Sequence, residues 1–162
     1  MSHLTHPETR IGHVHLKVAD LDRAIDFYGR VMGFELQQRF GTQAAFLSAG
    51  GYHHHIGLNT WDSQGGTPVP RGHTGLYHTA FLYPTRKALA QALRQALDAG
   101  VQLSGAADHG VSEAIYFDDP DGNGVEIYRD RDQADWPRNA NGELEMRNSR
   151  LDLDELLAEL DG

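Results

Sequence analysis

The sequence predicts an α+β fold made of two paired βαβββ modules, followed by a C-terminal tail that carries a short helix. Three observations lead to this prediction: a strand–helix–strand pattern that occurs twice, a cap and a glycine at the ends of each helix, and alternating strand-like segments after each helix. We place one domain at residues 1–130, with module one at 8–62, a linker at 63–75 and module two at 76–130. Residues 131–162 form the C-terminal extension.

The two predicted helices have the same types of residue at their N-terminal caps and C-terminal ends. Asp20 and Thr85 each precede apolar residues at helical spacing, and side chains of this type cap a helix by accepting a backbone N–H bond. Gly33 and Gly100 follow the helices, at the position where glycine most readily ends a helix. We therefore expect one amphipathic helix in each module.

Each helix is followed by three strand-like segments. We place them at 34–40, 43–49 and 54–61 in module one and at 101–105, 113–119 and 124–130 in module two. Pro, Asp-Gly and Asn-Gly between the last two segments give a strong turn signal. In the extension, a leucine stripe after Asp152 predicts a short helix that packs on the body or on a second subunit.

Composition narrows the function classes before any residue is singled out. The 162 residues carry a formal net charge of −9, which argues against nucleic acid and membranes as partners. Cysteine is absent, which excludes disulfides, thiolate metal sites and a cysteine nucleophile. We find neither a membrane-spanning apolar run nor a signal peptide, so we expect a cytoplasmic protein. The ten histidines mark where chemistry is to be sought, since histidine is the commonest metal ligand and acid–base side chain.

Three side chains are predicted to converge on one face of the paired modules. The strands that precede the two helices align at an offset of 65 residues (78 − 13), so His13 and His78 occupy equivalent positions. Because side chains alternate along a strand, both histidines face away from the helices, whereas Tyr77 points into the core. Glu126, in the last strand, shares the histidines' face, where a carboxylate is costly unless it is paired or binds a cation. Two histidines and a carboxylate suit Fe(II), and Mn(II), Zn(II) and Ni(II) also fit this ligand set.

Two groups of motifs indicate a family. Residues 12–28 read GHVHLKVADLDRAIDFY, and module two contains His109-Gly110-Val111-Ser112, Ile115-Tyr116-Phe117, Asp119-Pro120-Asp121-Gly122-Asn123 and Glu126. Over about residues 8–130 the chain resembles the vicinal oxygen chelate superfamily, whose paired βαβββ modules curl into a cup around a metal. Module two is most similar to the catalytic domain of type I extradiol catechol 2,3-dioxygenases. The best-known of these enzymes carry a further pair of modules, whereas we expect one pair in these 162 residues.

The resemblance implies a reaction and a role for each matching residue. The matching residues are the iron ligands His13, His78 and Glu126, the acid–base histidine His54, and two further helpers of catalysis, His109 and Tyr116. The implied activity is Fe(II)-dependent cleavage of catechol-type aromatic diols with O2 to 2-hydroxymuconic semialdehyde-type products, with Mn(II) as an alternative metal. His53 and His55 flank the acid–base histidine, and the motif match favours the middle one.

Two other function classes stay open at this point. One is a metal-dependent isomerase or transferase of the glyoxalase or fosfomycin-resistance type, and the other is a metal-free ligand-binding resistance protein. Glyoxalase-type sites commonly use four protein ligands, but the strand that follows His54 offers no carboxylate opposite Glu126. The expected partners are a small aromatic diol, O2 and further copies of the same chain, as a dimer or larger oligomer.

Overall fold

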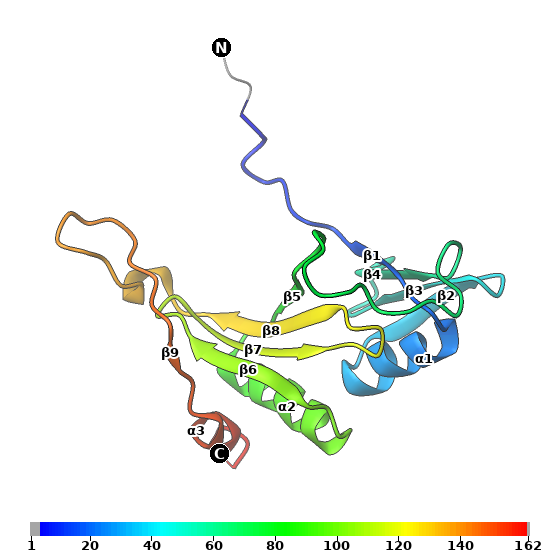
Figure 1. Cartoon of the computed structure of the whole chain (residues 1–162). Coiled ribbons are helices and arrows are strands. Elements are labelled where there is room, and N and C mark those ends of the chain that lie inside the picture. Colours follow the sequence, from blue (N-terminus) through cyan, green and yellow to red (C-terminus); the bar gives the residue numbers. More distant parts are fainter. Residues whose placement is uncertain (1–3, 162) are drawn as a thin grey trace.

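The computed structural model describes residues 4–161 and contains two β-sheets, each with a helix on one face (Figure 1). Sheet A has the strand order β1-β4-β3-β2, with β1 at Val14–Lys17, β2 at Glu35–Phe40, β3 at Ala44–Ser48 and β4 at Ile56–Asn59. Sheet B has the order β5-β8-β7-β6-β9, with β5 at Thr79–Leu82, β6 at Leu103–Asp108, β7 at Ser112–Asp118, β8 at Gly124–Asp130 and β9 at Ser149–Arg150.

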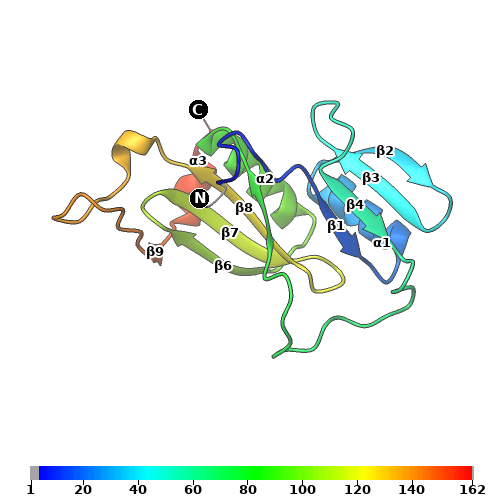
Figure 2. The same ribbon diagram turned by 90° about the horizontal axis from the view of Figure 1, so that it is seen from above.

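The two sheets have the same topology, which confirms the predicted pair of βαβββ modules. In each module the first strand pairs in parallel with the fourth, and the remaining neighbours are antiparallel. As a result β1 and β5, which follow the two predicted ligand histidines, are edge strands of their sheets. Figure 2 shows the sheets side by side, with the segment between β4 and β5 running outside both.

The helices begin and end where the sequence predicts. Asp20 and Thr85 cap α1 (Leu21–Asp26) and α2 (Arg86–Asp98) through their side chains. Gly33 and Gly100 follow with φ of 79° and 81°, in the left-handed region that favours glycine. One difference is that the first helix continues as the π-helical segment η1, Phe27–Val31, which adds a residue to the turn and which a 3.6-residue pattern does not reveal.

The C-terminal extension packs against module two. Its helix α3 (Leu153–Ala158) is capped by Asp152 as predicted and buries Leu156 completely, against the body rather than left free. Two short elements of the extension were not predicted: β9, which pairs with β6 through two residues, and the 3-10 helix η2 at Gln133–Asp135. Among residues 4–161, no helix is long and apolar enough to span a membrane.

The two modules join through the first helix rather than through their sheets. The hydroxyl of Tyr28, itself fully buried, donates to Oδ2 of Asp119 at 3.0 Å, and Arg23 pairs with Asp121 in the same turn of module two. Phe34 also contacts Phe81 of β5, with ring centroids 5.2 Å apart and the rings tilted by 53°. Within the described residues, no strand of sheet A hydrogen-bonds to a strand of sheet B.

Candidate active site

Three predicted site residues meet on the face of sheet B that α2 does not cover. Tyr116 of β7 and Glu126 of β8 are direct cross-strand partners, so their side chains leave the sheet on the same side. His78, immediately before β5, brings its Nε2 within 2.8 Å of Oε2 of Glu126. The hydroxyl of Tyr116 donates to Oε1 of the same carboxylate at 3.4 Å. Residues that are distant in the sequence therefore surround one carboxylate.

Gly124 allows β5 to approach β8 this closely. A Cβ at this position would overlap the carbonyl oxygen of Tyr77 and lie 3.1 Å from Cβ of His78. Backbone φ is not the reason, because Gly124 does not have a positive φ. Glycine is needed here for space, and that space sets the position of His78 beside the carboxylate.

Glu126 differs from Glu113, the other buried glutamate of this sheet, in the side chains that surround its carboxylate. Glu113 is 4% exposed, and Arg86, Arg129 and Arg131 all pair with its carboxylate. The Glu126 side chain is 11% exposed, and its partners are an imidazole and a phenol. A buried carboxylate without a full positive charge beside it is costly, and a bound divalent cation would supply that charge. The donor set of this site therefore fits a metal ion.

A hydrogen-bonded chain continues from the carboxylate to the C-terminal extension. Nε2 of His109 lies 2.8 Å from the hydroxyl of Tyr116, and its Nδ1 lies 3.1 Å from the carbonyl oxygen of Arg147. A carbonyl only accepts, so Nδ1 of His109 carries a proton. The single hydroxyl proton of Tyr116 lies between two acceptors when the ring is neutral, Nε2 of His109 at 2.8 Å and Oε1 of Glu126 at 3.4 Å. Burial, followed by the charge of Glu126, raises the pKa of Tyr116 to about 12, so this hydroxyl stays protonated at neutral pH.

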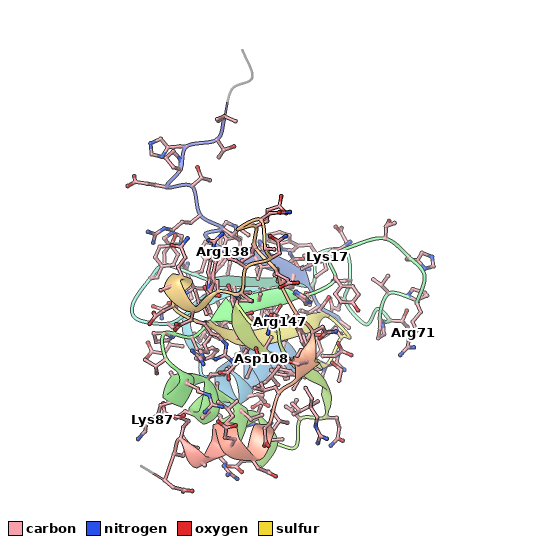
Figure 3. All side chains as sticks on the ribbon, turned by 90° about the vertical axis from the view of Figure 1, so that its left-hand side faces the viewer. Lys17, Arg71, Lys87, Asp108, Arg138 and Arg147 are labelled. Carbon is pink, nitrogen blue, oxygen red and sulfur yellow. The ribbon has the colours of Figure 1, made fainter. Side chains whose placement is uncertain are left out.

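His109 is held in place by both of its neighbouring segments. It lies in the turn between β6 and β7, where its N–H donates to the carbonyl of Ser112, and Gly110 beside it has a φ of 76°. The N–H of Arg147 donates back to the carbonyl of His109 at 2.9 Å. Figure 3 shows Arg147 beside Asp108, at the end of β6 that the extension crosses.

The other two predicted residues lie together on sheet A. His13 precedes β1 and is exposed, and its ring centroid lies 4.5 Å from that of His54, which precedes β4. His53 Nδ1 lies 2.8 Å from Nδ1 of His54, so one ring donates to the other. Partial burial, followed by the neighbouring histidines, lowers the pKa of His54, which favours its neutral form. His55 instead packs beside Tyr52.

The structure thus divides the six predicted residues between two places. His78, Glu126, Tyr116 and His109 form one connected group, whereas His13 and His54 form a second. Across residues 4–161, no three His, Asp or Glu side chains are arranged so that they could hold a metal ion. Two cavities of about 350 and 440 Å³ border β9, and none of the six residues lines either one.

The prediction for Tyr77 is wrong, and the contact between His109 and the carbonyl of Arg147 was not predicted. Tyr77 was expected in the core but is 91% exposed, because β5 begins only at Thr79 and the strand alternation does not extend back to it. The carbonyl of Arg147 is a backbone atom in the extension, where no side-chain motif could reveal it.

Comparison with known proteins agrees with this fold. The profile of the Glyoxalase/Bleomycin resistance protein/Dioxygenase superfamily matches residues 10–127. A catechol-2,3-dioxygenase of Bacillus subtilis is 37% identical over 155 residues, which cover 95% of this chain and 53% of that protein. Biphenyl-2,3-diol 1,2-dioxygenase 3 of Rhodococcus globerulus is 33% identical over 75% of this chain and 63% of its own length. The chain spans about half to two thirds of the length of these curated relatives.

Solved structures show the same architecture. A glyoxalase/dioxygenase from Nostoc punctiforme superposes with a TM-score of 0.65 at 19% identity, covering 82% of this chain and 99% of that chain. A lactoylglutathione lyase from Agrobacterium tumefaciens gives a TM-score of 0.59 at 24% identity, covering 76% of this chain and 96% of its own. At these identities the likeness concerns the fold. Taken with the profile match, it means that the chain belongs to the Glyoxalase/Bleomycin resistance protein/Dioxygenase superfamily.

Proposed function

We propose that this protein is an Fe(II)-dependent extradiol dioxygenase that opens the ring of catechol-type diols with O2. The expected products are of the 2-hydroxymuconic semialdehyde type, which gives the protein a role in the degradation of aromatic compounds. The named relatives from Bacillus and Rhodococcus support this reaction class. The single observation that carries the proposal is the buried carboxylate of Glu126, which contacts His78 and Tyr116 and, within residues 4–161, has no arginine or lysine partner.

The proposed ligands are His13, His78 and Glu126. His78 and Glu126 already have their donor atoms 2.8 Å apart on sheet B, and His13 contributes a third from sheet A. When bound by two histidines and a carboxylate, Fe(II) keeps open positions at which a diol and O2 can meet. Mn(II) has the same ligand preferences and remains the alternative metal.

The remaining site residues would handle protons and hold the substrate. His54, kept neutral by its lowered pKa, is suited to accept the proton that a catechol hydroxyl releases and to return it to the leaving oxygen. Tyr116 keeps its proton at neutral pH and can donate a hydrogen bond to a substrate oxygen. His109, oriented by the carbonyl of Arg147, holds the oxygen of the tyrosine hydroxyl in place through Nε2.

Domain boundaries and location belong to the proposal as well. We keep one catalytic domain over residues 1–130 with the extension at 131–162, because the extension reaches the site only through backbone contacts of the Arg147 region. Cytoplasmic location stays a prediction.

An aerobic assay with separate metal analysis tests the proposed function. The protein is loaded anaerobically with Fe(II), catechol is added, and both the yellow ring-opened product and O2 consumption are followed. His78→Ala should lose iron and turnover together, whereas His54→Phe should retain iron and lose turnover. His73→Ala, in the exposed segment between the modules, is the matched control and should keep both.

The result that contradicts the proposal is equally specific. If the iron-loaded protein leaves catechol and its alkyl- and aryl-substituted forms unchanged and consumes no O2, the dioxygenase assignment is wrong. Metal-dependent turnover of another substrate without O2 would instead place the protein with the isomerases or transferases of the superfamily.

A further inference from the structure

The turn that carries His109 begins and ends beside two carboxylates that face each other. Asp108 is the last residue of β6 and Glu113 is its direct cross-strand partner on β7, so their side chains leave the sheet on the same side. This is the side that α2 covers, since Glu113 pairs with Arg86 at the start of that helix. Residues 109–111 join the two strands at this point. His109 therefore follows directly after one of the two carboxylates.

Arg131 bridges these two carboxylates. Its Nη2 lies 2.6 Å from Oδ2 of Asp108 and 3.3 Å from Oε1 of Glu113. Like charges directly opposite each other on neighbouring strands weaken the pairing, and a guanidinium between them offsets the repulsion. The three side chains are 29%, 27% and 4% exposed, so solvent screens their charges only in part. The arginine thus holds the ends of β6 and β7 together beside the turn.

The other polar atoms of Asp108 hold both segments that contact the His109 ring. Its Oδ1 accepts from the N–H of Gly110 at 2.8 Å, and its carbonyl accepts from Oγ of Ser149 at 3.1 Å. Gly110 follows His109 in the turn, and Ser149 lies two residues after Arg147, whose carbonyl accepts from Nδ1 of the ring. One aspartate therefore fixes the backbone that carries the ring and the segment that orients it.

We propose that Arg131 is a positioning residue for His109. By holding Asp108, it keeps the imidazole where Nδ1 donates to the carbonyl of Arg147 and Nε2 lies beside the hydroxyl of Tyr116. Such contacts set which ring nitrogen carries the proton, so a loosened turn lets the neutral ring populate both tautomers. The effect on turnover rests on the proposed function of the site, whereas the effect on the ring rests on these contacts alone.

Arg129 provides a matched control. It pairs with the same Glu113, through its Nε at 2.7 Å, and its side chain is 18% exposed. Within residues 4–161 it makes no ion pair with Asp108. Arg131→Met and Arg129→Met therefore remove the same charge from the same glutamate, and only the first removes the bridge. Both leave in place the backbone N–H of Arg131, which donates to the carbonyl of Val111.

Nitrogen NMR of the His109 ring in the metal-free protein is the direct test, at a pH where imidazole is neutral. His109→Gln identifies the signals by their loss. Wild type and Arg129→Met should show one tautomer, with the proton on Nδ1, whereas Arg131→Met should show both. Asp108→Asn breaks the same bridge from its other end and keeps an acceptor for the turn, so it should also show both.

Turnover of the iron-loaded protein is the second readout. Arg131→Met should lower kcat for catechol by about 10-fold with KM and bound iron unchanged, because a small displacement of a positioned group is costly in the transition state. Arg129→Met should retain the wild-type kcat.

The outcomes separate this role from general stability and from the proposed reaction. A single Nδ1–H tautomer in both Arg131→Met and Asp108→Asn would overturn the positioning role, and Asp108→Asn decides alone if Arg131→Met does not fold. Equal mixing of tautomers in Arg129→Met would also overturn it, because the cause would then be the shared Glu113 cluster. If iron-loaded wild type leaves catechol intact, the proposed function fails, and the tautomer comparison still decides the role of Arg131.

Discussion

Replacing the two buried glutamates of sheet B by glutamine should change stability in opposite directions. Glu113 and Glu126 lie on adjacent strands, and their side chains are 4% and 11% exposed. They differ in their partners: three arginines surround the first, and an imidazole and a phenol contact the second. Glu113→Gln and Glu126→Gln therefore make the same chemical change at similar burial, and each is the control for the other.

The expected changes in the free energy of unfolding follow from the partners that each substitution leaves without a carboxylate. Glu113→Gln removes a carboxylate that pairs with three arginine side chains, which are 18% to 29% exposed. Two of these arginines keep another carboxylate partner: Arg86 pairs with Glu155 and Glu159, and Arg131 pairs with Asp108. Breaking a buried ion pair from one side costs about 3–5 kcal/mol, and discounting for this partial exposure leaves about 2–3 kcal/mol. Among the described residues, Glu126 has an imidazole and a phenol but no arginine or lysine as partner, so metal-free Glu126→Gln should be within about 1 kcal/mol of wild type or more stable than it.

Urea unfolding in the presence of a chelator, repeated anaerobically with Fe(II), measures both effects. The expected order of free energies of unfolding without metal is Glu126→Gln at or above wild type, and Glu113→Gln clearly below. Fe(II) should stabilise wild type and Glu113→Gln, since a ligand that binds only the folded state raises its stability by mass action, and should leave Glu126→Gln unchanged.

The reasoning is refuted if Glu126→Gln costs as much as Glu113→Gln in the metal-free state. Its carboxylate would then be a structural group satisfied by the protein alone. Equal stabilisation of both variants by iron would likewise remove Glu126 from the ligand set.

Three further predictions concern single groups of the structure. Burial and the charge of Asp119 raise the pKa of Tyr28 in the folded state, so the stability that this tyrosine provides is complete below pH 10 and falls above it by about 1.4 kcal/mol per pH unit. In urea unfolding from pH 8 to 11, Tyr28→Phe should therefore lose less free energy of unfolding with rising pH than wild type does. An equal loss in both proteins would contradict this. Tyr116→Phe should retain iron but slow ring cleavage by about 100-fold, and loss of iron in elemental analysis would instead make it a ligand-holding residue. Gly124→Ala should destabilise the protein by about 1–3 kcal/mol, seen as a lower midpoint of thermal unfolding, and should weaken Fe(II) binding, because the added Cβ displaces Tyr77 and His78 before β5. Gly75→Ala is the control, since a Cβ there has no atom within 4 Å.

The elements with local signals were predictable from the sequence. Helix caps at Asp20, Thr85 and Asp152 are short-range hydrogen bonds, and each is present as expected. The alternation of β8 correctly placed Glu126 on the face opposite the buried Val125. Helix caps and strand alternation depend on residues that are close in the sequence, so the local sequence pattern is enough to predict them.

Features that depend on the relation between distant segments were not predictable. The contact between His78 and Glu126 depends on the parallel pairing of β5 and β8, and the separation of His13 from both depends on how the modules pack. Tyr28 and Asp119 hold that packing, and although each lies in one of the family motifs, neither motif reveals that the two side chains pair. The orientation of His109 by a backbone carbonyl has no sequence signal at all.

Oxygen stoichiometry tests the central claim most directly. The iron-loaded protein is placed in a closed cell with an oxygen electrode, a limiting amount of catechol is added, and O2 loss is compared with ring-opened product. An extradiol dioxygenase consumes one O2 per catechol, forms no hydrogen peroxide and gives a yellow semialdehyde. Product formed without O2 uptake, or an iron-loaded protein that consumes none in the presence of catechol, would contradict the account.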